Sequence, residues 1–386
     1  MHLISRLTTR LLAWHLKPSD AKNYDFLDGL RGLAILLVIG CHLVYVNPNS
    51  SGYVKFIGGI FGAGASGVTL FFCLSGYLVS LPFWKRKWAN KIPVVPTGYV
   101  SRRFYKIYPP MALSILIFTP IYLYVEPFQG LLRTAGEWLV GAPLLFPVDG
   151  RFNPPMWSLI VEVQFYLMLP VVMLVFRNIS MRKSIWIIPL LFALIGICSR
   201  YTLAAFGVVG TLYPNIYVPF LSGLDMFTMG VLIAGLYTMG LIAKSWAKMG
   251  NVGLLMFLGT LPVGSFIHLT QKETWCQEET ISFIQKMAFG CMLLFVADDQ
   301  CFASKLLCNP LLRWIGVISY EWYLFHVPIY WWIRNALGPA NGSSLTYLII
   351  VGGSFMASLL LAALVYRYFS LPILMYGRNH NKPTVK

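Results

Sequence analysis

One stretch near the start of the chain, FLDGLRGLAILLVIGCH (26–42), sets three ionisable side chains into an apolar run. They are Asp28, Arg31 and His42. The run predicts a helix that enters the hydrocarbon core of a membrane. An ionisable side chain costs about 2.5–3.5 kcal/mol there by insertion scales, so those that are present usually face a cavity or a partner. The stretch therefore indicates a membrane helix with one functional face.

The composition of the whole chain supports a membrane protein. Of the 386 residues, 57% are hydrophobic and 11% are charged, against about 25% charged in a typical soluble domain. The net charge of +16 comes from basic residues in short loops between apolar runs, so no basic domain exists to bind nucleic acid. Seven cysteines occur without a C-x-x-C pair. We therefore expect neither a metal site nor a nucleic-acid partner.

Apolar segments recur along the chain and predict an all-α bundle of about ten transmembrane helices. The domain prediction is an N-terminal tail (1–26), a transmembrane domain (27–370) and a C-terminal tail without regular structure (371–386). The segment at 126–155 has room for a short re-entrant or interfacial piece. The spans are placed approximately at 28–46, 57–82, 108–125, 156–176, 185–206, 216–240, 251–270, 281–297, 311–335 and 345–369.

Basic residues give this topology an orientation. With a cytoplasmic N-terminus, 21 of the 30 Lys and Arg residues fall on inside segments or near the inner helix ends, and four fall on outside segments. Cytoplasmic loops of membrane proteins carry such an excess. We therefore expect both termini in the cytoplasm and a multi-pass protein of the cell inner (cytoplasmic) membrane.

The spacing of the three ionisable residues in 26–42 has a geometric consequence. Asp28 and Arg31 are three residues apart and can pair across one helical turn. Arg31 and His42 are eleven apart, so both project from one face, about 16 Å apart along the axis. An anionic donor from the cytoplasm would meet Arg31 first and His42 deep in the membrane. The alternative is an Asp–Arg cap on the helix end and one structural histidine.

Two later spans also carry polar residues on one face. Ser158, Glu162 and Tyr166 recur at four-residue intervals, next to Trp157 at the predicted outer interface. A second set, Ser319, Tyr323 and His326, shares a face of the ninth predicted span. Asp225 and Glu321 are further acids within spans, and the pattern assigns them no sharper role.

Five segments in order, covering about 24–372, resemble the acyltransferase-3 family of integral-membrane O-acyltransferases. The first is the L-D-G-L-R-G context in which an Arg is followed by ten residues and a His. Four departures are visible: Thr69 for a frequent Asp, Lys106 for the usual Arg, Glu321 as an unusual acid at a variable position, and YFSLP (368–372) where many members carry a Glu before the Pro. The other four segments are GVTLFFCLSGYL (67–78), RRFYKIYP (102–109), WSLIVEVQFY (157–166) and ISYEWYLFH (318–326).

The resemblance implies transfer of an acyl group, commonly acetyl from acetyl-CoA, to a hydroxyl of a polysaccharide or lipid-linked glycan. His42 is the expected general base, since imidazole titrates nearest neutral pH, with Arg31, Asp28 and Glu162 beside it. Arg102, Arg103 and Lys106 are expected to bind the CoA phosphates, although such residues also enforce topology and touch lipid headgroups. The expected substrate cavity is lined by Trp157, Ser158, Tyr166, Ser319, Tyr320, Tyr323 and His326.

Two other functions remain open at the level of sequence. One is a transporter for an anionic solute or lipid, with Arg31, His42 and Glu162 along its pathway; the lack of an internal repeat counts against an inverted-repeat transporter. The other is a carrier that passes the acyl group across the membrane to a separate periplasmic transferase. We therefore expect acyl-CoA, a glycan acceptor and membrane lipid as partners, with a periplasmic transferase as a further candidate.

Overall fold

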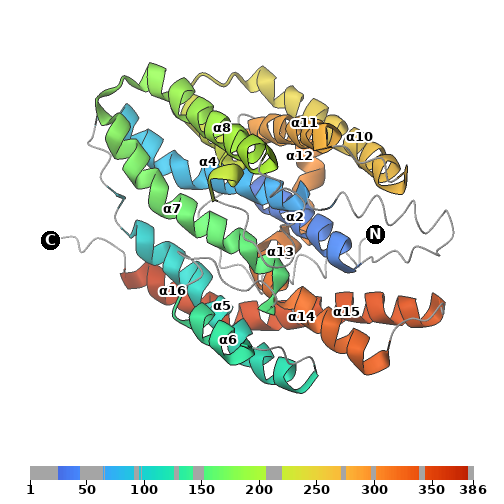
Figure 1. Ribbon diagram of the computed structural model, residues 1–386. Coiled ribbons are helices and arrows are strands. Elements are labelled where there is room, and N and C mark those ends of the chain that lie inside the picture. Colours follow the sequence, from blue (N-terminus) through green and yellow to red (C-terminus); the bar gives the residue numbers. More distant parts are fainter. Residues whose placement is uncertain are drawn as a thin grey trace. The chain divides into compact units, whose positions relative to one another are not determined.

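The computed structural model describes residues 25–43, 64, 66–90, 95–96, 98–125, 130–141, 152–205, 220–270, 275–296, 301–338 and 344–380. Throughout these ranges the regular structure is helical, and no strand occurs in them (Figure 1). The all-α prediction is therefore confirmed. The chain divides into two compact units. The first unit consists of 1–94, 166–201 and 221–317, and the second unit of 95–165, 202–220 and 318–386.

The first unit is built around α4, which packs on both α2 and α9, while α13 packs on α2 and α10 on α11. Its helices are α2 (Asp25–Leu43), α4 (Ser66–Trp88), α8 (Met181–Ala205), α9 (Asp225–Thr238), α10 (Lys248–Thr270), α11 (Trp275–Leu293), α12 (Phe302–Leu307) and α13 (Pro310–Val317).

In the second unit α14 packs against α15 and α5. Helix α7 (Trp157–Val175) begins here and continues into the first unit. The other helices of this unit are α5 (Tyr99–Val125), α6 (Leu131–Leu139), α14 (Ser319–Leu337), α15 (Ser344–Val365) and α16 (Leu371–His380).

Seven helical segments in the described ranges are long and apolar enough to cross a membrane, and they make this a multi-pass membrane protein. A helix also lies in each of the ten predicted spans. The ninth predicted span, 311–335, is not one helix, because α13 ends at Val317 and α14 begins at Ser319. Helix α9 has only 14 residues.

The close packing of α4 on α9 depends on glycine. A Cβ added to Gly230 would lie 1.9 Å from the Cys73 carbonyl oxygen, and one added to Gly76 would lie 2.5 Å from that of Phe227. Small residues let the backbones of membrane helices approach in this way. The Trp84 indole then donates a 3.0 Å hydrogen bond to the Val231 carbonyl. The two helices are thus held along several turns.

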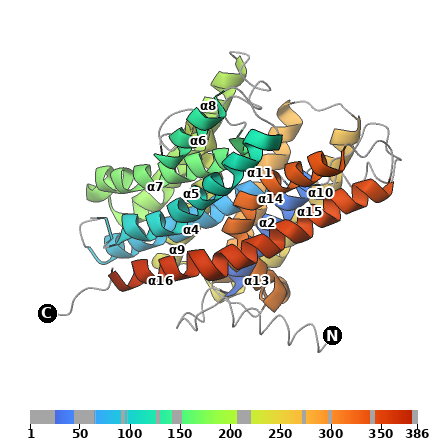
Figure 2. The same ribbon diagram turned by 90° about the horizontal axis from the view of Figure 1, so that it is seen from below.

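Two segments outside the predicted spans also have structure. The segment 126–155, which the sequence predicts to lie outside, contains the short helix α6 (Leu131–Leu139), as the sequence allowed. The prediction of an unstructured tail after residue 370 is wrong for 371–380, which form α16. A π-helical turn, Tyr366–Ser370, joins α15 to α16, so that Figure 2 shows them as one continuous rod.

Candidate functional site

The start of α2 is fixed by close backbone packing on α12 and α13. A Cβ on Gly29 would lie 1.9 Å from the Leu307 carbonyl oxygen, and a Cβ on Gly316 would lie 1.8 Å from that of Asp28. An ion pair between Arg313 and Asp25, with 2.5 Å between Nη2 and Oδ1, adds to this contact. The helix that carries the sequence-predicted base therefore has a rigid support.

The three residues of α2 that the sequence predicts for the site, Asp28, Arg31 and His42, lie on partly exposed positions among buried neighbours. Arg31 Nη1 donates to Asp28 Oδ1 at 2.7 Å, as predicted from the spacing. The helix runs without interruption from Asp25 to Leu43, so Arg31 and His42 share a face about 16 Å apart along the axis. The Asp28–Arg31 pair and the common face are both confirmed.

The hydrogen bond of His42 decides its tautomer. Nδ1 lies 2.9 Å from the Val38 carbonyl oxygen. A carbonyl oxygen can only accept, so the proton of the neutral ring lies on Nδ1 and the lone pair on Nε2. A histidine oriented in this way through one nitrogen presents the other as a base.

The three basic residues of α5 differ in their surroundings. Arg102 and Lys106 are exposed and lie one turn apart on the same face. Arg103 instead stacks over the Tyr99 ring, with Cζ 3.9 Å from the ring centre, and Nη1 donates to the Tyr99 carbonyl at 3.1 Å. Arg102 and Lys106 therefore share an exposed face of α5, whereas Arg103 is held against Tyr99.

A polar cluster in the second unit ties the start of α7 to α14. The Tyr323 hydroxyl donates to the Pro155 carbonyl and lies 2.8 Å from Ser158 Oγ. Since the single hydroxyl proton of Tyr323 is used on Pro155, Ser158 is the donor to Tyr323. Asn153 Nδ2 donates to the Leu324 carbonyl at 3.0 Å. Ser158 and Tyr323, both predicted from sequence for one cavity, are therefore neighbours.

Four further polar residues of α14, which are Ser319, Tyr320, Glu321 and His326, lie within the second unit. Tyr320 donates from its hydroxyl to the Ile107 carbonyl at 2.8 Å. His326 is fully buried, and its Nδ1 lies 2.8 Å from the Tyr323 carbonyl oxygen. Glu321 is 3% exposed and interacts electrostatically with Lys106 of α5. Ser319 is buried on the same helix.

The predicted site residues thus fall into two groups. Asp28, Arg31 and His42 belong to the first unit, together with Tyr166 on the later part of α7. The others, including Glu162 and Trp157 on the start of α7, belong to the second unit. The single catalytic centre that the sequence predicts joins residues of both units, and it stays a prediction.

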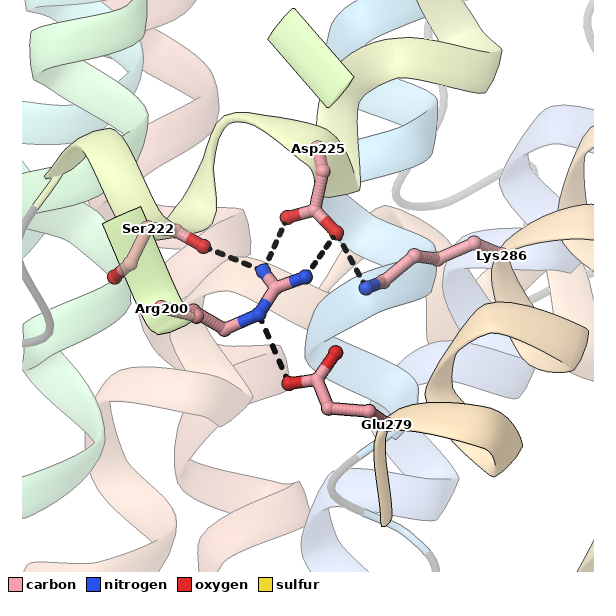
Figure 3. A network of polar contacts seen from close by, with 5 residues as sticks. All are labelled: Arg200, Ser222, Asp225, Glu279 and Lys286. Carbon is pink, nitrogen blue, oxygen red and sulfur yellow. Dashed lines mark hydrogen bonds and ion pairs between the residues drawn. The ribbon is translucent and has the colours of Figure 1, made fainter. Parts of the chain in front are cut away.

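Sequence reasoning missed a charged network in the first unit, drawn in Figure 3. Arg200 of α8 contacts Asp225 and Glu279, and Lys286 of α11 also contacts Asp225. The sequence does show that Arg200, Asp225 and Lys286 are charged residues within or at the ends of spans. Their pairing was not visible, because the partners are 25 and 61 positions apart.

Comparison with known proteins matches residues 24–367 to the acyltransferase domain family. The peptidoglycan O-acetyltransferase OatA of Listeria monocytogenes is 23% identical over 92% of this chain and 56% of its own length. The O-acetyltransferase OatA of Staphylococcus aureus is 23% identical over 91% of this chain and 58% of its own. A putative O-acetyltransferase of Staphylococcus aureus is 21% identical over 92% and 58%.

The chain therefore spans a little over half the length of these relatives. No solved structure matches it. The family match covers most of the chain and includes all five sequence segments, and the described helices have the lengths and apolar composition of a membrane bundle. This chain belongs to the acyltransferase-3 family of membrane proteins.

Proposed function

We propose that this protein is an O-acyltransferase of the cell inner membrane. It moves an acyl group, in the simplest case acetyl, from cytoplasmic acyl-CoA to a hydroxyl of an envelope polysaccharide or a lipid-linked glycan. The observation that carries this proposal is the orientation of His42 by Val38 on the same helix face as the Asp28–Arg31 pair. The O-acetyltransferase names of the relatives support the same reaction class.

His42 acts as the general base in this reaction. Nε2 takes the proton of the acceptor hydroxyl while the hydroxyl oxygen attacks the carbonyl carbon of the thioester. The tetrahedral intermediate carries a negative charge on the former carbonyl oxygen. It collapses with cleavage of the C–S bond, and the imidazolium returns the proton to the leaving CoA thiolate. The products are the acyl ester and CoA, so atoms and charge balance.

Arg31 and Asp28 serve the donor side of this reaction. A guanidinium binds phosphate and carbonyl oxygens in a fixed geometry, and the 2.7 Å bond to Asp28 holds the guanidinium of Arg31 in place. The exposed Arg102 and Lys106 on α5 attract the CoA phosphates, and Arg103 supports the segment through its stacking on Tyr99. The acyl chain then reaches towards His42.

The acceptor side is assigned to residues of α7 and α14. Glu162 contacts the acceptor or orients the base, and Trp157, Ser158, Tyr166, Ser319, Tyr320, Tyr323 and His326 line the substrate cavity. The pairing of Ser158 with Tyr323 at 2.8 Å supports part of this assignment. A separate periplasmic transferase remains the natural partner if the acyl group leaves this protein before it reaches the final glycan.

The test uses the purified full-length protein in proteoliposomes with acetyl-CoA labelled in the acetyl group. In one assay, label is measured in extracted envelope glycan that is added outside the vesicles. In a second assay without acceptor, label is measured inside the vesicles. The proposal predicts label in the glycan as an alkali-labile ester. Intact labelled donor inside the vesicles, without ester formation, would instead identify a transporter and overturn the proposal. Label bound to the protein, and passed on only after a second transferase is added, would identify an acyl carrier and overturn direct transfer.

A further inference from the structure

Asp225, the first residue of α9, is the centre of a buried charged network (Figure 3). Arg200 donates to it through Nη1 at 2.6 Å and Nη2 at 2.8 Å. Lys286 Nζ lies 2.5 Å from Asp225 Oδ2. The side chains of Asp225 and Lys286 are 6% and 7% exposed. Both cations therefore contact one carboxylate that has little access to water.

Arg200 has two further contacts, which extend the network. Its Nη1 donates to the Ser222 carbonyl at 2.7 Å, and its Nε lies 2.9 Å from Glu279 Oε1. The four charged side chains are two acids and two bases, so their charge sums to zero. A buried network is tolerated when it is paired and hydrogen-bonded in this way, and loss of one member leaves an uncompensated charge.

The network lies at the start of a helix that is too short to cross a membrane. Helix α9 has 14 residues, or about 21 Å, against a hydrocarbon core of about 30 Å. The 3₁₀ turn Phe220–Gly223 precedes it. Irregular backbone at membrane depth needs partners within the protein, and Arg200 supplies one to the Ser222 carbonyl. The network thus anchors the start of a short apolar helix.

The anchored helix is connected to His42 by two tight backbone contacts. Gly230 of α9 meets the Cys73 carbonyl of α4, where an added Cβ would lie 1.9 Å away. Gly67 of α4 meets α2, where an added Cβ would lie 2.4 Å from the Ala34 carbonyl oxygen and 2.9 Å from Val38 Cγ2. Val38 accepts the hydrogen bond that orients His42. Contacts this close transmit a displacement of α9, since packed backbones cannot compress.

We propose that the Arg200–Asp225–Lys286–Glu279 network is a positioning device for His42, which acts by fixing α9 and, through α4, the helix face that carries the base. This proposal rests on the proposed function of His42. None of the four residues is required to touch a substrate. Their contribution is to the rate of the chemical step and not to the binding of donor or acceptor.

Charge balance makes a distinctive prediction for single and double variants. Asp225→Asn leaves two cations facing one acid, and we expect kcat for acyl transfer to fall by about 10- to 100-fold, because a displacement of about 1 Å at the reacting groups costs that much. The KM values for donor and acceptor stay within about twofold. Adding Lys286→Met restores neutrality through the remaining Arg200–Glu279 pair, so the double variant is faster than Asp225→Asn alone.

The matched control is Glu137→Gln in α6, which neutralises one acid of an exposed ion pair with Arg133. We expect this variant to keep the wild-type kcat. If the folded double variant is no faster than Asp225→Asn, charge balance does not matter and the proposal is wrong. If the Asp225→Asn protein does not accumulate in the cell, the kcat values of Lys286→Met and Lys286→Arg are compared instead. A slower Lys286→Met with an unaffected Lys286→Arg supports the proposal, and full activity of Lys286→Met overturns it.

A second measurement tests the network without any assay of transfer. Cys73 is 1% exposed and lies at the contact of α4 with α9. In a variant that keeps Cys73 alone among the cysteines, we expect slow labelling by a small permeant maleimide in detergent. Asp225→Asn increases the labelling rate severalfold, and the added Lys286→Met reverses this increase. Unchanged labelling in a folded Asp225→Asn variant overturns the proposal.

The two measurements separate the network from the proposed function. If Cys73 labelling changes with the charge of the network but the protein transfers no acyl group, the network fixes α9 as proposed and the proposed reaction is wrong. If the wild-type protein is active and Asp225→Asn changes neither kcat nor Cys73 labelling, the positioning role of the network is wrong and the proposed reaction stands.

Discussion

Helices α2 and α14 each carry a histidine whose Nδ1 bonds a carbonyl one turn earlier, yet they are held in different ways. Helix α2 is held by backbone contacts at glycine, such as Gly316 against Asp28. Helix α14 is held by side-chain hydrogen bonds, from Tyr320 to Ile107, from Trp322 to Ser358 and from Tyr323 to Pro155.

The difference separates polar groups used for packing from polar groups left on a partly exposed face. On α14 the hydroxyl of Tyr323 is consumed between Pro155 and Ser158, and His326 is fully buried. On α2 the packing needs no polar side chain at these glycines, so Arg31 and His42 stay on partly exposed positions. The polar residues of α14 are thus tied into the packing of their own unit, whereas those of α2 keep the partial exposure that the proposed reaction at His42 requires.

The largest effect on stability is expected where α2 meets α13. In Gly316→Ala the new Cβ would lie 1.8 Å from the Asp28 carbonyl oxygen. Overpacking against backbone cannot be relieved by a rotamer change, so we expect a loss of about 3 kcal/mol or more. Thermal unfolding in detergent measures it. Gly352→Ala on α15 is the control, because nothing lies within 4 Å of its Cβ, and equal losses in both variants would contradict the account of α2.

The next effect concerns the buried histidine of α14. His326→Gln replaces a fully buried ring that bonds the Tyr323 carbonyl at 2.8 Å. We expect a loss of about 2 kcal/mol from the unmade hydrogen bond and the altered packing, with residual acyl transfer in the folded fraction. The unfolding midpoint and the specific activity are measured together. Complete loss of transfer at an unchanged midpoint would give His326 the reactive role instead.

A smaller effect is expected for the cluster between α7 and α14. Tyr323→Phe removes the donor to Pro155 and the acceptor of Ser158, so it should cost about 1–2 kcal/mol. Ser158→Ala removes only the bond that the Tyr323 hydroxyl accepts and keeps the bond from Tyr323 to Pro155. It should therefore cost about 1 kcal/mol or less. Chemical denaturation of the two variants and the double variant measures their coupling. Additive losses would argue against the shared hydroxyl.

The smallest effect is expected for the ion pair on α6. Arg133 is 85% exposed, and its Nε lies 2.8 Å from Glu137 Oε1. Exposed pairs at this spacing contribute about 0.3–0.5 kcal/mol, so Glu137→Gln should leave the unfolding midpoint almost unchanged at moderate salt. A loss above about 1 kcal/mol would show that this pair is part of the packing.

Much of the fold could be predicted from sequence, since an apolar run of span length is a local signal. A helix lies in every predicted span, and the Asp28–Arg31 pair forms as its spacing requires. The break at Ile318 and the helix after residue 370 were not predicted. Both depend on packing between segments, which no local pattern records.

The candidate site was predicted less completely, for a similar reason. Spacing along one helix located Arg31 with His42 on a face, and resemblance brought Ser158 and Tyr323 into one group. The network around Asp225 joins α8, α9 and α11, and only the tertiary structure pairs these residues. Asn153, whose Nδ2 donates to Leu324, carries no ionisable group and gave no signal.

The central claim is that His42 is the base of an acyl transfer reaction. It is tested most directly by the initial rate of acetyl transfer from labelled acetyl-CoA to envelope glycan, measured for purified wild-type protein and His42→Gln in the same detergent. We predict transfer by the wild type and a rate at least about 100-fold lower for the variant, with the same unfolding midpoint. Equal rates for the two proteins would contradict the account.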